Sequence, residues 1–105
     1  MIYTGFINET EVAKAVDQVI ANLGPEVVRV RYNIGEDSTG DTALFFRVVL
    51  SDSVAVDRQS FFDAAQRVTA TLREQLQSLE NWGLFPYVRF RSNAEQNELG
   101  DAKWA

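Results

Sequence analysis

Apolar residues recur at helical spacing in two stretches of the chain. In the first, over about residues 9–23, Val12, Val16 and Val19 fall three or four positions apart, which places them on one side of a helix. Asn8 precedes the stripe and is a typical N-cap residue. The pattern therefore predicts an amphipathic helix that buries one side.

The second helical pattern runs over about residues 58–80. Leu72, Leu76 and Leu79 belong to its apolar stripe, and Asp57 stands where an N-cap residue is expected. We expect one long helix that ends near Trp82.

Three other stretches alternate between apolar and polar positions, which is the pattern of strands with one buried face. They cover residues 26–34, 42–50 and 84–91. The second is the most apolar and is predicted at the centre of the sheet. Pro86 lacks a backbone donor and places the third strand at an edge, while the polar segment 35–41 is typical of a hairpin loop.

The order of these elements predicts an α+β fold with a mainly antiparallel sheet and two helices on one face. If Met1–Ile7 forms a further strand, the order is βαββαβ, a ferredoxin-like arrangement; otherwise it is αββαβ. The first alternative is favoured. Residues 1–91 are expected to form a single domain, and residues 92–105 a loose polar tail.

Composition excludes several classes of chemistry. The 105 residues include no cysteine and no histidine, which rules out disulfides, thiolate zinc sites, cysteine nucleophiles and histidine triads. No phosphate-binding loop motif or nucleophile elbow occurs, so we expect no enzyme activity, no cofactor and no metal. No apolar run suits a membrane span and no secretory signal opens the chain, which favours a cytoplasmic protein without a membrane partner.

Arginine placement is the unusual feature of this sequence. Although the formal net charge is −5, five arginines lie on the three strands, each out of phase with the inward-facing apolar set. We expect Val28 to point toward the helices and Val49 away from them. The face opposite the helices should then carry the arginines together with aromatic residues. The candidate binding residues are Arg29, Arg31, Arg47, Arg89, Arg91, Phe45, Phe85 and Tyr87.

Five like charges on one small sheet need anions or partners, and exposed aromatics beside them are uncommon on a monomer. One interpretation is purely structural: nearby acids and the tail cover the face. The acids that can supply counter-charges are Glu36, Asp37, Asp41, Glu95, Glu98 and Asp101. Trp104 in the tail can dock either on the domain or on a partner.

The functional interpretations share the same face. The first is protein association, as a homodimer or as an accessory or regulatory partner of another, acidic protein. The second is single-stranded nucleic-acid binding, with bases stacked on Phe45, Phe85 and Tyr87, although the RNP aromatic signature is absent. The third is a regulatory domain that binds a small anion.

Overall fold

The structure is a computed structural model and describes residues 7–105. Five of its elements form the sheet and its helical layer, and the other three are short helices. In chain order they are α1 (Glu9–Ala21), β1 (Val27–Glu36), β2 (Thr42–Leu50), α2 (Arg58–Leu76), α3 (Ser78–Trp82), β3 (Phe85–Ser92), α4 (Asn93–Leu99) and the 3-10 helix η1 (Ala102–Trp104).

The strands form a mixed sheet in the order β1-β2-β3. β1 and β2 are an antiparallel pair, joined by the short loop that begins at Asp37. β3 pairs with β2 in parallel, because α2 and α3 return the chain to the end of the sheet where β2 began. The expectation of a mainly antiparallel sheet is therefore corrected to a mixed one, while the central place of β2 and the edge place of β3, with its Pro86, are confirmed.

The ferredoxin-like arrangement is not confirmed. From α1 onward the described elements follow the order αββαβ, with α4 and η1 added at the end. The expected opening strand falls on Met1–Ile7, of which residues 1–6 lie outside the described part of the chain. What the structure shows is an α+β fold with a three-stranded sheet.

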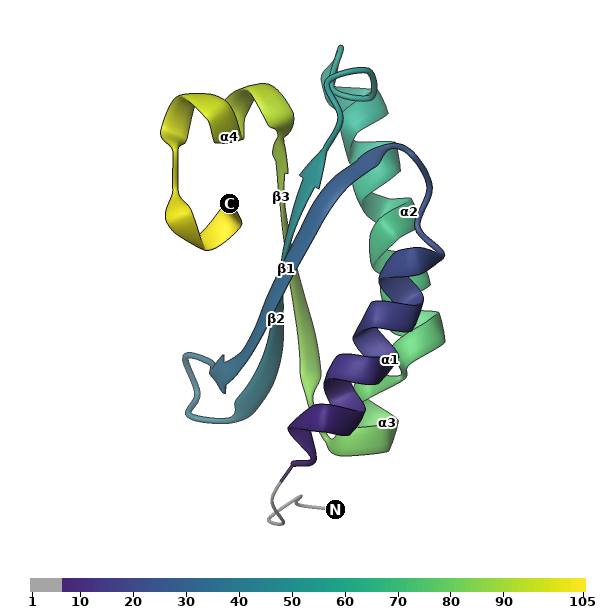
Figure 1. Ribbon diagram of the computed structural model, residues 1–105, viewed down its shortest axis with the longest axis vertical. Coiled ribbons are helices and arrows are strands. Elements are labelled where there is room, and N and C mark those ends of the chain that lie inside the picture. The colour runs from purple at the N-terminus through teal and green to yellow at the C-terminus, as the bar shows by residue number, and fades with distance from the viewer. Residues whose placement is uncertain (1–6) are drawn as a thin grey trace.

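α1 and α2 lie side by side on one face of the sheet, and α4 and the C-terminus lie on the other (Figure 1). Fully buried β2 side chains, including Leu44, Phe46 and Val48, meet Val16 and Leu72 in the core between the sheet and the two helices. Both predicted caps are present: Asn8 Oδ1 accepts from the Glu11 amide and Asp57 Oδ1 from the Ser60 amide.

The long predicted helix is interrupted. Gln77 has φ 45°, a left-handed conformation that separates α2 from α3. The Asn81 side chain donates to the Leu76 carbonyl, and the buried Ser78 hydroxyl donates to the Leu84 carbonyl. The first bond satisfies a carbonyl at the end of α2, and the second ties the start of α3 to the segment before β3. The interruption turns Leu79 out of the apolar stripe, so the expectation that it is buried is wrong.

A bulge changes the alternation at the start of β1. The register with β2 shifts between Val27 and Arg29, which inserts one residue into the strand. Val27 packs against the core, and Val28 is exposed. The inward orientation expected of Val28 is therefore wrong, whereas Val30 is buried as the alternation predicted.

The C-terminal segment has regular structure instead of forming a loose tail. Ser92 ends β3 and caps α4 with a reciprocal capping box: its hydroxyl accepts from the Glu95 amide, and the Glu95 carboxylate accepts from the Ser92 amide. The chain turns at Gly100, which has φ 62°, and η1 then places Trp104 against the sheet with 5% of its surface exposed.

Candidate binding face

Strand register brings the eight candidate residues together on the sheet face that lies opposite α1 and α2. We call this surface the arginine–aromatic face. Arg31, Arg47 and Arg89 are Cα partners across the three strands and form one row. The neighbouring rows are Arg29, Val49 and Arg91 on one side, and Asn33, Phe45 and Tyr87 on the other, with Phe85 one row further.

The chain's own C-terminal segment lies over the arginine half of this face and leaves part of Arg31 exposed; this half is made of Arg29, Arg31, Arg47, Arg91 and Val49. Three guanidinium groups donate through Nε to three successive main-chain carbonyls. Arg47 donates to Lys103 at 2.9 Å, Arg29 to Trp104 at 2.8 Å and Arg31 to Ala105 at 2.7 Å.

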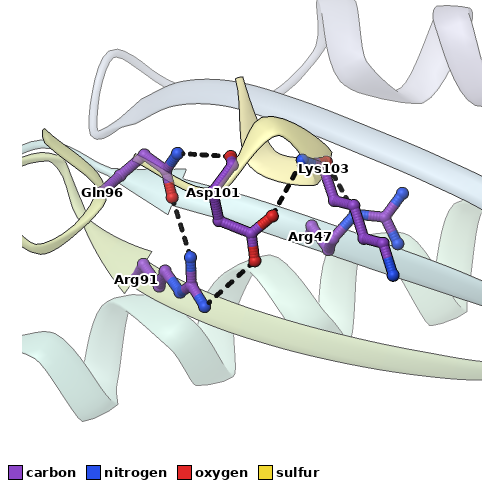
Figure 2. A network of polar contacts seen from close by, with 5 residues as sticks. All are labelled: Arg47, Arg91, Gln96, Asp101 and Lys103. Atoms are coloured by element: carbon purple, nitrogen blue, oxygen red, sulfur yellow. Dashed lines mark hydrogen bonds and ion pairs between the residues drawn. The ribbon is translucent and has the colours of Figure 1, made fainter. Parts of the chain in front are cut away.

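Arg91 holds α4 and η1 together through side-chain contacts (Figure 2). It donates to Gln96 Oε1 at 2.9 Å, and Gln96 in turn donates to the Asp101 carbonyl at 2.8 Å. The Asp101 carboxylate lies 3.7 Å from the second Arg91 nitrogen. The guanidinium also lies over the Trp104 ring, 4.2 Å from its centroid, within cation–π distance.

The C-terminal segment buries part of a surface that could have been open according to the sequence. Val49, expected on an open surface, is only 1% exposed. Asp101 is the one expected acid that pairs with an arginine of the face among the described residues, whereas Arg29, Arg31 and Arg47 donate to main-chain oxygens. The interpretation that the tail covers the face therefore applies to one half, and the interpretation of an open surface is corrected there.

The aromatic half, made of Phe45, Phe85, Tyr87 and Arg89, stays open. The rings of Phe45 and Tyr87 stack at 5.2 Å, and Phe85 tilts against Tyr87 at 4.9 Å. Phe85 is 43% exposed and Tyr87 is 38% exposed. The guanidinium of Arg73, from α2, lies 5.9 Å from the Phe85 ring centroid. Its side chain extends the positive border of this half beyond the sheet.

Tyr87 is fixed by the hairpin loop. Its hydroxyl donates to Asp37 Oδ2 at 3.0 Å. The other Asp37 oxygen accepts from the Thr39 hydroxyl at 2.6 Å and from the Asp41 amide. The bond to Asp37 raises the pKa of Tyr87, and the Thr39 hydroxyl, with the other donors, lowers the pKa of Asp37.

We expect Asp37→Asn to bring the pKa of Tyr87 back toward the ordinary value of about 10, because the substitution removes the negative charge that penalises the phenolate. The ¹³Cζ shift of Tyr87, followed by NMR between pH 8 and pH 12, measures this change. Glu36→Gln, in the same loop, is the control and should leave the titration midpoint in place. An unchanged midpoint in Asp37→Asn would contradict the Asp37–Tyr87 bond.

A cleft of about 380 Å³ lies where the two halves meet. Four cationic residues and one acid line it, together with aromatic side chains and Asn33. The Asn33 side-chain oxygen accepts from Arg47 at 2.6 Å. The charged residues are Arg47, Arg89, Arg91, Lys103 and Asp101; the aromatic ones are Phe45, Phe46, Tyr87 and Trp104.

Sequence reasoning located the sheet residues and missed those that the C-terminal segment contributes. Asp101 was named only as a possible counter-charge, and Gln96 and Lys103 were not named for the face, because a tail without periodicity gave no reason to place them. The Ser92-to-Glu95 spacing is the signal that could have found α4, since it is the pattern of a capping box.

Two further classes of site were considered. Within residues 7–105, no group of three or more acidic side chains is arranged to hold a metal ion. No helix in the same range combines the length and the apolar character needed to cross a membrane.

Comparison of the chain with protein-family models, with curated proteins and with solved structures finds no match. The functional argument therefore rests on the geometry of the arginine–aromatic face.

Proposed function

We propose that this protein is a non-enzymatic binding module that associates with an acidic segment of a partner protein through its aromatic half. The observation that carries the proposal is the division of the arginine–aromatic face. The C-terminal segment covers the arginine half, while Phe45, Phe85, Tyr87 and Arg89 stay uncovered.

The exposed rings support association because they form one contiguous cluster. Phe85 and Tyr87 contact each other, and Tyr87 contacts Phe45. Contiguous apolar surface is usually small on monomers, and tyrosine, phenylalanine and arginine are enriched at the centres of interfaces. Rings already held by mutual packing and by the Tyr87–Asp37 bond lose little side-chain freedom on binding.

Charge favours an acidic partner. Arg89 and Arg73 border the rings, and neither forms an ion pair with another residue of the described chain. A homodimer that pairs this surface with itself would bring two such cationic borders together, at an electrostatic cost. Nucleic-acid binding is less well supported, because Tyr87 packs on both other rings instead of offering free faces for bases.

A labelled peptide that alternates glutamate with leucine tests this proposal by fluorescence anisotropy. We expect the protein to bind this peptide and not its lysine–leucine counterpart. Phe85→Ser and Arg89→Gln should each weaken binding about tenfold, or about 1.4 kcal/mol, because each removes a central contact.

The matched controls lie on α2, away from the face. Phe62→Ser removes another exposed phenylalanine and Arg58→Gln another exposed arginine, and both should leave the affinity unchanged. No binding, or equal losses in Phe62→Ser and Phe85→Ser, would overturn the proposal. If light scattering gave twice the 11.8 kDa chain mass, and Phe85→Ser returned the mass to that of one chain, a homodimer would replace the proposal. Tighter binding to a mixed oligonucleotide would replace it with nucleic-acid recognition.

A further inference from the structure

Uncompensated positive charge is concentrated in the cleft between the two halves. Arg31, Arg47 and Arg89 are direct cross-strand partners, and like charges in this relation are destabilising. Arg47 bonds to the main-chain carbonyl of Lys103 and to the side-chain amide oxygen of Asn33, which accept hydrogen bonds and leave its net charge in place. The row therefore still favours an anion.

Asp101, the single acid that lines the cleft, already has partners within the chain. Its carboxylate contacts Arg91 and accepts from the Lys103 amide at 3.0 Å. Arg91 is thereby compensated, and the other three cations lining the cleft, Arg47, Arg89 and Lys103, make no ion pair with any residue of the described chain. Figure 2 shows the side chains of Arg47 and Lys103 extending in the same direction, away from Arg91 and Asp101.

We propose that this cleft binds a small organic phosphate, with its dianionic group held by Arg47, Arg89 and Lys103. A phosphate monoester carries about −1.5 to −2 charges near neutral pH and has three strong acceptor oxygens, which suits a cleft lined by these three cations. Guanidinium groups also bind phosphate oxygens in a forked geometry that a lone ammonium does not offer.

The walls favour a phosphate that carries an apolar, flat group. Phe45, Tyr87 and Trp104 line the same cleft as the cations. The volume of about 380 Å³ lies at the low end of the ~300–1,000 Å³ that small-molecule sites span. The stacked edges of Phe45 and Tyr87 provide an apolar surface beside Arg47 and Arg89, which are the next residues along β2 and β3 on the same face.

This cleft shares Phe45, Tyr87 and Arg89 with the proposed protein contact, but each of the two sites also has a residue of its own. Lys103 comes from η1, whereas Arg47 and Arg89 come from the sheet, so a bound anion bridges the C-terminal segment and the domain. Phe85, central to the proposed protein contact, does not line the cleft. The two proposals can therefore fail separately.

Phenyl phosphate is the probe, titrated into the ¹⁵N-labelled full chain at pH 7.5 and followed by amide shifts. We expect saturable shifts at the strands and at η1, with about tenfold tighter binding than inorganic phosphate because of the aromatic walls. Sodium chloride at matched ionic strength should give no saturable shifts. Affinity should fall between pH 7 and pH 5, as the phosphate dianion takes up a proton near pH 6 and becomes a monoanion.

Charge-matched variants test the residues. Arg89→Gln and Lys103→Gln should each weaken phenyl phosphate binding about tenfold, whereas Arg58→Gln and Lys14→Gln, on α2 and α1, should not. Phe85→Ser should retain the phenyl phosphate affinity even where it loses peptide binding. The proposed site would be overturned if Lys103→Gln and Lys14→Gln bound phenyl phosphate equally well. It would also be overturned if sodium chloride reproduced the amide shifts. Equal binding of both phosphates would overturn the role of the aromatic walls.

Discussion

Trp104→Ala should lower the free energy of unfolding by about 3 kcal/mol, the low end of the range for truncating a large buried aromatic. Trp104 is 5% exposed, and its ring lies under the Arg91 guanidinium at 4.2 Å. The low end is expected because α4 and η1 can detach from the sheet without unfolding the core, which limits the loss to the free energy of docking. Urea denaturation followed by circular dichroism measures the change.

Leu99→Ala is the matched control for this substitution. Leu99 belongs to the same C-terminal segment and is largely exposed, so its truncation should change stability by less than about 0.5 kcal/mol. If Trp104→Ala were as mild as Leu99→Ala, the segment would not be docked as the structure shows. Amide exchange in the Trp104→Ala variant should also lose protection at α4 and keep it at α2.

Phe46→Ala should destabilise the fold by about 3–5 kcal/mol, the largest effect of a single substitution considered for this chain. Phe46 is one of the largest fully buried side chains, lies on the central strand and packs against the core beneath α1 and α2. Its removal leaves a cavity that well-packed neighbours fill only in part. The same denaturation measurement gives the value, and a small protein can lose most of its stability in this way.

Phe45→Ala provides the comparison from the adjacent position on the opposite face. Phe45 is only half-buried and stacks on Tyr87, so we expect a loss of about 1 kcal/mol, from the aromatic pair and a modest change in buried area. Comparable losses at Phe45 and Phe46 would contradict the assignment of their faces. The contrast separates the residue that maintains the core from the one available for binding.

Alternation along the strands was sufficient to find the arginine–aromatic face. A strand places alternate side chains on opposite sides, so one inward residue such as Phe46 determines the orientation of Phe45 and Arg47. The rule failed at Val28 because a bulge inserts a residue, and nothing in a run of two valines marks where a bulge occurs.

The pairing of strands and the ends of helices were harder to predict from the sequence than the faces of single strands. The direct parallel pairing of β3 with β2 depends on where α2 and α3 return the chain, and periodicity within a strand does not specify its neighbour. The break at Gln77 is accompanied by local side-chain hydrogen bonds of Ser78 and Asn81, which the apolar stripe of the helix does not reveal.

The groups that cover the arginine half could not be identified from the sequence for a related reason. Its guanidinium groups bond to main-chain carbonyls of residues 103–105, and every residue carries such a carbonyl whatever its side chain. The sequence analysis considered only acidic side chains as counter-charges. Of the acids it named, Asp101 alone pairs with an arginine of the face in the described chain. The sequence thus indicated how much charge the face carries, but not which groups would meet it.

The most direct test of the covered arginine half is a NOESY spectrum of the full chain. The structure leads us to expect cross-peaks between the Trp104 indole protons and the side-chain protons of Arg91, together with slow exchange of the Gln96 side-chain amide that donates to Asp101. Trp104 at random-coil shifts, with no cross-peak to Arg91, would show an undocked C-terminal segment and contradict the account.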